Sequence, residues 1–448
     1  MMNFDELKKI MRDNGIVGAG GAGFPSYAKL NKSVDTVILN CAECEPLLRL
    51  HRSLLEKYAY EIMWALDIVS KTIGASNTIV ALKSAYKKAL EAVKGELASF
   101  ENITICTLDE IYPAGDEVVL IYEATGRVVP PGEIPASVGV TVFNVETMYN
   151  LYKAANDNSP VIKKYVTVTG EVKNPQTFLV PIGTKLADVI AMSGGETVSD
   201  PAYVLGGPMM GRLGSANEYV TKTTNAIIVL PQNHYVVMRK KVKPSVDLKR
   251  TMASCCQCRY CTDLCPRHLL GHPIEPHEFM RVVSDSNVAK IDPYLDAMFC
   301  CSCGLCEMYS CQQGLSPRAL IDEFKKGMRA AGIGPRKGIK PTPVPKSREF
   351  RKVPIDRLRS RLGLDSYDVS APISDTVIVP REVRIMLSQH IGVPAVPCVN
   401  AGEKVSEGQL IAATPEDKLG VSIHSSVNGK VKEINQKYIV ISTEGGNR

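Results

Sequence analysis

The sequence predicts an α/β protein that is divided into several domains. Three observations support this prediction. The chain has 448 residues, more than a single hydrophobic core usually supports. Residues 1–160 alternate strand-like apolar runs with segments of helical periodicity. Residues 241–334 contain most of the cysteines, and residues 376–448 consist of short Val- and Ile-rich runs separated by glycines.

The alternation in residues 1–160 favours a parallel, Rossmann-like sheet covered by helices. An amphipathic helix is predicted first, over 1–12, and its charged residues distinguish it from a secretory signal. Strands are then predicted over 34–39, 78–82, 103–108 and 140–143, and helices over 54–69 and 84–97.

The remaining segments differ in character. Residues 161–240 are predicted to form a small β-rich domain with one helix, over 186–192. Residues 241–334 are expected to be mostly helical between the cysteines. Residues 335–375 are rich in proline, lysine and arginine and are predicted to be a linker. Residues 376–448 are predicted to form a compact all-β domain.

The formal net charge of +6 is mild for this length, and much of the excess lies between 336 and 361. A solvated linker or a contact for an acidic protein is the commoner interpretation of such a stretch, and nucleic-acid binding is the alternative. We predict no nucleic-acid partner. The longest apolar runs, such as 226–230, are far too short to span a bilayer, so we expect a soluble, cytoplasmic protein.

Two cysteine runs have the spacing of iron–sulfur ligands. The first is C-x2-C-x2-C-x3-C-P, as in bacterial two-cluster ferredoxins, and the second has one extra residue before its last cysteine. Three closely spaced thiolates hold one [4Fe–4S] cube, and the fourth cysteine usually crosses to the other cube. We therefore assign one cluster to Cys255, Cys258, Cys261 and Cys311, and the other to Cys265, Cys300, Cys303 and Cys306.

Other interpretations of these cysteines are weaker. Zinc prefers two separated pairs of ligands, and disulfides need an oxidising compartment. Cys256 and Cys301 each lie next to an assigned ligand. We interpret both as small buried residues, although either could replace a ligand.

A glycine-rich loop near the N-terminus has the pattern G-x-G-x-x-G. It follows a predicted helix rather than a strand, so it is not a dinucleotide fingerprint. Its glycines still allow the backbone to approach a phosphate, and a helix beginning at residue 26 would favour an anion. Lys29 could add a positive charge, and a flexible loop is the alternative. The four glycines are Gly18, Gly20, Gly21 and Gly23.

Polar residues follow the predicted strands. Asn40, Glu43 and Glu45 come directly after the first strand, where ligands bind in open α/β sheets. Cys41 and Cys44 form a C-x-x-C pair within this loop, and a redox dithiol is its less favoured interpretation. Two further polar segments, at 112–117 and 144–147, complete the set.

In this order, these four segments resemble the flavin- and NADH-binding subunit of respiratory complex I. The resemblance is closer to the RnfC-type subunit of the Rnf electron-transport complex, which shares the Glu-Cys-Glu-Pro sequence at 43–46 and both ferredoxin runs. Residues 165–215 resemble its soluble-ligand-binding β-grasp (SLBB) domain. Residues 394–434 resemble a barrel-sandwich hybrid that lacks the Met-Lys attachment pair. Because this domain comes last, the chain is most similar to the family of microcompartment cobalamin reductases.

The resemblance implies an FMN site and an NADH site in the first domain. It places the FMN phosphate on the four glycines near Lys29, and NADH against Phe24 and Glu45. Glu43 and Glu45 are the implied catalytic residues. Ala42 and Asp116 depart from the complex I pattern, which favours FMN binding over NADH binding. The implied flavin contacts are Asn40, Glu43, Tyr112, Gly115, Asp116, Glu117, Asn144 and Thr147.

The implied function is electron transfer from NADH through FMN and two clusters to an acceptor. NADH donates two electrons and a cluster carries one, so a flavin must stand between them. The resemblance suggests cobalamin as the acceptor, a bacterial microcompartment as the location, and a corrinoid adenosyltransferase or shell protein as a partner. A subunit of a membrane ferredoxin:NAD complex is the alternative, and a non-catalytic binding module is the third.

Overall fold

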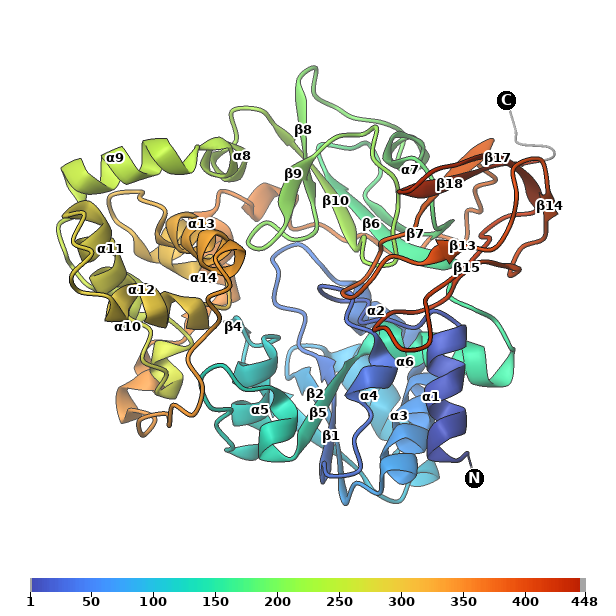
Figure 1. The fold of residues 1–448 in the computed structure, drawn as a ribbon, viewed down its shortest axis with the longest axis horizontal. Helices are drawn as coiled ribbons and strands as arrows, with labels where there is room; N and C mark the ends of the chain where they lie inside the picture. The colour runs from blue at the N-terminus through green and yellow to red at the C-terminus, as the bar shows by residue number, and fades with distance from the viewer. Residues whose placement is uncertain (1, 444–448) are drawn as a thin grey trace.

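The computed structural model describes residues 2–443, which form four structural regions (Figure 1). The N-terminal domain lies below the SLBB-like sheet, and the cysteine-rich and C-terminal regions lie on opposite sides of the molecule (Figure 1). The predicted multidomain fold with mixed helix and sheet content is confirmed. Residue 1 and residues 444–448 of the predicted domains lie outside the described residues.

The N-terminal domain is built on the expected parallel sheet. Its strand order is β3-β2-β1-β5, and every pairing is parallel. The prediction for β3 agrees at both ends, whereas the helix predicted over 54–69 is two helices separated at Tyr58, whose φ is −131°. The strands are β1 (Thr36–Cys41), β2 (Asn77–Lys83), β3 (Ile103–Leu108) and β5 (Val140–Asn144). The helices are α1 (Phe4–Asp13), α2 (Leu50–Lys57), α3 (Ala59–Ile73), α4 (Lys87–Glu96), α5 (Glu117–Thr125) and α6 (Val145–Asn156).

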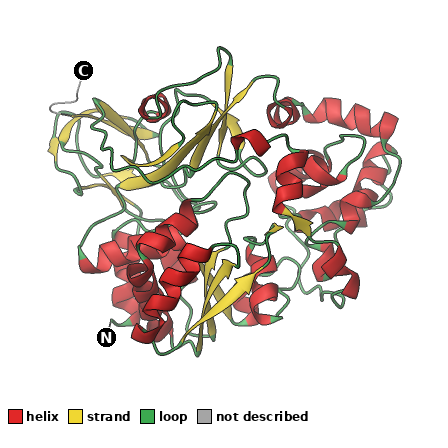
Figure 2. Cartoon of the chain, turned by 180° about the vertical axis from the view of Figure 1, so that it is seen from behind, coloured by secondary structure: helices red, strands yellow, loops and turns green. Residues whose placement is uncertain are grey.

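Helices cover both faces of this sheet (Figure 2). Successive side chains of a strand point to opposite faces. Val37 and Leu39 of β1 therefore pack in one core with α2, α3, α4 and α6, whereas Ile38 packs with α5 in the other. This arrangement leaves the carboxyl ends of β1 and β5 open for a ligand site.

The SLBB-like domain contains a mixed five-stranded sheet with the order β7-β6-β10-β8-β9. The β6–β10 pairing is parallel, and the other strand pairings described in this sheet are antiparallel. Helix α7 (Leu186–Met192), predicted with the same bounds, packs on the sheet through Leu186 and Val189. The strands are β6 (Lys163–Gly170), β7 (Gln176–Pro181), β8 (Pro201–Leu205), β9 (Arg212–Gly214) and β10 (Ala226–Pro231).

The cysteine-rich region is helical and the C-terminal region is all-β, as predicted. Helix α8 (Tyr235–Lys241) packs on the SLBB-like sheet through Val236 and Val237, so residues 161–240 contain a second helix where the sequence predicted one. The helices of the cysteine-rich region are α9 (Pro244–Ser254), α10 (Tyr260–Asp263), α11 (Pro276–Ser284), α12 (Asp292–Asp296) and α13 (Pro317–Ala330). The C-terminal strands form two sheets, ordered β12-β18-β17-β14 and β13-β15-β16. These strands are β12 (Glu382–Met386), β13 (Val396–Pro397), β14 (Lys404–Val405), β15 (Leu410–Ala413), β16 (Ile423–His424), β17 (Gly429–Ile434) and β18 (Tyr438–Thr443).

The segment 335–375 agrees with the predicted solvated linker over 335–347, which is mostly exposed, whereas the part after residue 347 packs onto the molecule. Strand β11 (Val353–Pro354) pairs antiparallel with β4 (Ile111–Tyr112) of the N-terminal domain. Helix α14 (Ile355–Arg361) follows, and Leu358 is fully buried. Several of the segment's cations form ion pairs within the chain, as Arg348 does with Glu123. Apolar anchors and internal ion pairs therefore dock the segment onto the rest of the molecule.

Within residues 2–443, no helix has both the length and the apolar character that crossing a bilayer requires.

Candidate functional site

A cavity of about 480 Å³ lies between the glycine-rich loop and the carboxyl ends of β1 and β5. Its volume is within the range of about 300–1,000 Å³ that small-molecule sites occupy. Residues 134–136 also line it, and nothing in the sequence indicated them. The predicted residues that line it are Gly18, Gly20, Gly21, Gly23, Phe24, Lys29, Asn40, Gly115, Glu117, Asn144 and Thr147.

The glycine-rich loop is a fixed turn rather than a flexible one. The Gly18 amide donates to the Phe24 carbonyl at 2.9 Å, and the Ala19 amide donates to Thr147 Oγ1 at 3.1 Å. A Cβ on Gly20 would lie 2.4 Å from Asn144 Nδ2, whereas one on Gly21 would meet no atom within 4 Å. The loop is thus a backbone cradle with space beside Gly21, as a phosphate requires.

Positive charge at the cradle is limited. The helix expected at residue 26 is one short 3₁₀ turn, Ser26–Lys29, without a side-chain cap. Lys29 Nζ lies 2.5 Å from Glu117 Oε1 and donates to the Val142 carbonyl at 3.0 Å. Lys29 therefore lines the cavity as half of an ion pair, and the anion would be held mainly by backbone amides.

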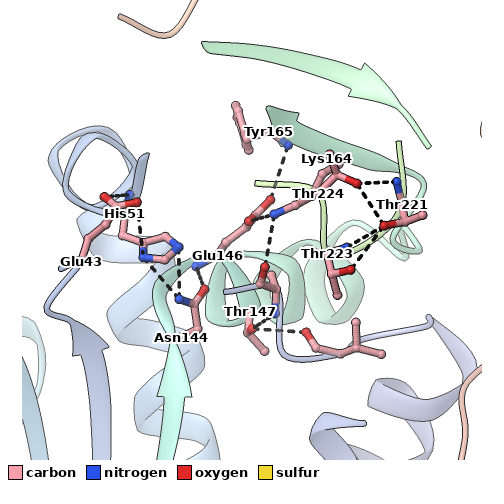
Figure 3. Close-up of polar contacts among 12 residues, drawn as sticks. Glu43, His51, Asn144, Glu146, Thr147, Lys164, Tyr165, Thr221, Thr223 and Thr224 are labelled. Carbon is pink, nitrogen blue, oxygen red and sulfur yellow. Dashed lines mark hydrogen bonds and ion pairs between the residues drawn. The ribbon is translucent and has the colours of Figure 1, made fainter. Parts of the chain in front are cut away.

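A layer of polar side chains lies next to the cradle and includes Glu43, His51, Asn144 and Glu146 (Figure 3). Asn144 Oδ1 accepts from the Glu146 amide at 3.0 Å, and its Nδ2 lies 3.1 Å from His51 Nε2. Glu43 accepts from the His51 amide at 3.1 Å. The Glu43 side chain therefore faces His51 and is not among the residues that line the cavity.

The same layer contains a buried ion pair between Lys164 and Glu146 (Figure 3). Each residue is 1% exposed. Burial lowers the pKa of Lys164, and the carboxylate of Glu146 opposes that shift. Sequence reasoning missed both Lys164 and His51, because each is recognisable only by contacts to residues elsewhere in the chain.

Besides Glu43, three predicted site residues lie outside the cavity lining. Glu45 accepts from the amides of Met209 and Met210, both at 2.8 Å, in the SLBB-like domain. Burial raises the pKa of Glu45, although these amides oppose the shift. Tyr112 and Asp116 contact the cysteine-rich region instead. The flavin and NADH roles of these residues and of Glu43 therefore remain predictions without support from the cavity.

The C-x-x-C pair lacks the properties of a redox dithiol. Cys41 and Cys44 are both free thiols, and Cys41 is fully buried in β1. Burial, with the nearby charge of Glu45, raises the pKa of Cys44 to about 12. Because the thiolate is the reactive form, both thiols are expected to be inert at neutral pH.

The cysteines of the two runs line two small cavities. Each cavity combines three cysteines of one run with the fourth of the other, the crossed arrangement that the spacing predicts. We name them the outer and inner cysteine sets. The outer set is Cys255, Cys258, Cys261 and Cys311. The inner set is Cys265, Cys300, Cys303 and Cys306.

The two sets differ in exposure. Cys258 of the outer set is exposed, whereas Cys265 and Cys303 of the inner set are buried. Cys256, predicted to be buried, is exposed, and Cys301 is half-buried beside the inner set. No group of His, Cys, Asp or Glu side chains in residues 2–443 is arranged to hold a single metal ion. In a cube each thiolate binds a different iron, so the sulfurs need not converge on one point.

Family models match nearly all of these regions. Residues 11–153 match the Nuo51 FMN-binding domain, and residues 165–213 match the SLBB domain. Residues 254–316 match a 4Fe-4S dicluster domain, and residues 368–445 match the RnfC barrel sandwich hybrid domain. The chain therefore contains an FMN-binding domain and a domain for two iron–sulfur clusters.

Three curated relatives show how far the similarity extends. The chain is 39% identical to the cobalamin reductase PduS of Citrobacter freundii, over 97% of this chain and 96% of that protein. It is 39% identical to PduS of Salmonella typhimurium, over 98% and 97%. One subunit of the Na(+)-translocating ferredoxin:NAD(+) oxidoreductase complex of Acetobacterium woodii is 34% identical over 60% of this chain and 59% of its own length.

Proposed function

This chain belongs to the cobalamin reductase PduS family, and from that premise we propose that it transfers electrons from NADH to a cobalamin. FMN exchanges an electron pair with a nicotinamide and single electrons with [4Fe–4S] clusters, which is the chemistry that such a transfer needs. Identity of 39% along almost the whole of both PduS proteins supports this function over that of an Rnf-type subunit, which matches only 60% of the chain.

One observation carries the proposal: a flavin-sized cavity with a glycine cradle and two crossed cysteine sets occur in one folded chain. We propose that the amides around Gly20 and Gly21 bind the FMN phosphate. Asn40 supports the opposite wall, because its Nδ2 donates to the Gly115 carbonyl at 2.9 Å. Asn144 and Thr147 hold the cradle in place through His51 and Ala19.

We propose the eight cysteines of the inner and outer sets as the cluster ligands. Thiolates are soft donors and suit iron–sulfur iron. The domain boundaries predicted from the sequence and an NADH position near Phe24 are proposals of the same kind. Location inside a bacterial microcompartment, and association with a corrinoid adenosyltransferase or a shell protein, follow from the same resemblance and are also proposed.

An anaerobic NADH titration tests the function. Protein purified without oxygen should contain one FMN and about eight iron atoms per chain. NADH should bleach the flavin absorbance and produce cluster signals in electron paramagnetic resonance, and added cob(III)alamin or cob(II)alamin should reverse both changes. A protein that NADH reduces but that no cobalamin reoxidises would contradict the proposed acceptor, and a flavin that NADH does not bleach would contradict the proposed donor.

A further inference from the structure

A partly buried ion pair joins the N-terminal domain to the cysteine-rich region. Arg267 donates to both carboxylate oxygens of Asp116, at 2.5 and 2.9 Å, and the side chains are 11% and 17% exposed. Arg267 follows Cys265 of the inner set by two residues. Asp116 also caps α5, since its Oδ1 accepts from the amides of Val118 and Val119. One carboxylate thus links the start of α5 to the inner set.

A second contact lies four residues earlier in the same turn. Tyr112 is 2% exposed, and its hydroxyl donates to the carbonyl oxygen of Cys303 at 2.5 Å. Tyr112 and Cys303 share a hydrophobic core with Leu305, Met308 and other apolar residues. The turn 112–117 is therefore attached at two points to two different segments that carry inner-set cysteines.

The same turn also borders the FMN cavity. Gly115 and Glu117, on either side of Asp116, line that cavity, whereas Asp116 and Tyr112 do not. The residues of this turn therefore fall into two groups, according to what they contact. Gly115 and Glu117 face the cavity, whereas Tyr112 and Asp116 contact the segments that carry the inner set. The exposed Cys258 belongs to the outer set.

We infer that Tyr112 and Asp116 are positioning residues for the iron–sulfur region and not flavin contacts. With Arg267 they form a junction that holds the inner cysteine set against the turn lining the FMN cavity. The outer set is then the more distant one and lies at the surface. This inference rests on the proposed cofactors, and it differs from the flavin role that the family resemblance implies for both residues.

Two conservative substitutions test the junction while leaving the fold intact. Asp116→Asn removes the charge partner of Arg267 but keeps a side chain that caps helices equally well. Tyr112→Phe removes only the hydroxyl. Each variant should retain FMN within twofold of the parent, and each should shift or remove one cluster signal of the dithionite-reduced protein. The signal that survives in both should be the one that Cys258→Ala abolishes.

A double variant tests whether the ion pair acts as a unit. If the pair acts as a unit, adding Arg267→Met to Asp116→Asn should alter the cluster signal no further than Asp116→Asn alone does, whereas additive losses would contradict a shared role. Gly20→Ala is the matched control, and it should lose FMN while keeping about eight iron atoms per chain. Loss of FMN from Asp116→Asn or Tyr112→Phe with unchanged cluster signals would overturn the inference, and so would unchanged FMN together with unchanged signals.

The outcomes also distinguish this inference from the proposed function. A parent protein without FMN or without about eight iron atoms per chain would contradict the proposed function itself. Failure of the inference is seen only in variants of a parent that carries both cofactors.

Discussion

Replacing Gly20 with alanine should weaken FMN binding about tenfold or more. A Cβ at this position would lie 2.4 Å from Asn144 Nδ2, 3.0 Å from Asn144 Cγ and 3.2 Å from His51 Cε1. A carbon atom does not pack stably 2.4 Å from the Nδ2 atom of Asn144. Either Asn144 must move or the glycine cradle must lift away from the cavity.

Each of these movements costs free energy. The Asn144 side chain is the N-cap of α6, and loss of an N-cap costs about 0.5–2 kcal/mol. Overpacking a filled site costs about 1–3 kcal/mol. Since about 1.4 kcal/mol corresponds to a tenfold change in a binding constant, a cost of this size at the cradle should appear as a loss of affinity of roughly tenfold or more.

The assay is the dissociation constant for FMN, from quenching of flavin fluorescence, together with FMN and iron per purified chain. Gly95→Ala is the control, because a Cβ on Gly95 in α4 would meet no atom within 4 Å. It should bind FMN like the parent, and iron should stay constant in both variants. A Gly20→Ala protein that binds FMN within twofold of the parent would refute the cradle.

The remaining predictions concern buried thiols and charges. Cys258→Ala should lower iron from about eight to about four atoms per chain, and an unchanged iron assay would remove Cys258 from the ligand set. Lys164→Met should cost about 3–5 kcal/mol in chemical denaturation because it leaves Glu146 buried and unpaired, and adding Glu146→Leu should recover most of this loss; equal losses would contradict the pairing. Burial lowers the pKa of Lys222 from 10.5 to about 7, so the unfolded chain binds the extra proton between these values and stability should rise with pH across that window relative to Lys222→Met. A stability difference between the two proteins that does not change with pH would show that Lys222 does not titrate there.

Local patterns predicted the regular elements well. The bounds of β3 and α7 agree with the sequence prediction because strong periodicity and flanking turn residues define both ends. The break at Tyr58 was missed because helical periodicity continues on both sides of it. The packing of the second part of the segment 335–375 was missed because the charge and proline content of the segment outweighed the apolar spacing of Leu358 and its neighbours.

The candidate site likewise has features that local sequence patterns predicted and features that they did not. The glycine cradle and both cysteine runs are short-range patterns, since their spacing along the chain already limits the chemistry. Spacing along the chain does not determine where each side chain of a polar loop points. Glu45, Tyr112 and Asp116 follow the expected strands, but amides of the SLBB-like domain and groups of the cysteine-rich region compete for them.

Spacing in the chain therefore accounts for the cofactor classes of this protein, because short stretches of sequence contain the three closely spaced thiolates of each cysteine run and the whole glycine cradle. Packing between segments far apart in the sequence determined the other parts of the site. His51 meets Asn144 across 93 positions, and Arg267 meets Asp116 across 151. No local propensity encodes such contacts, which arise only when burial of apolar surface brings distant segments of the chain together and their polar groups must find partners.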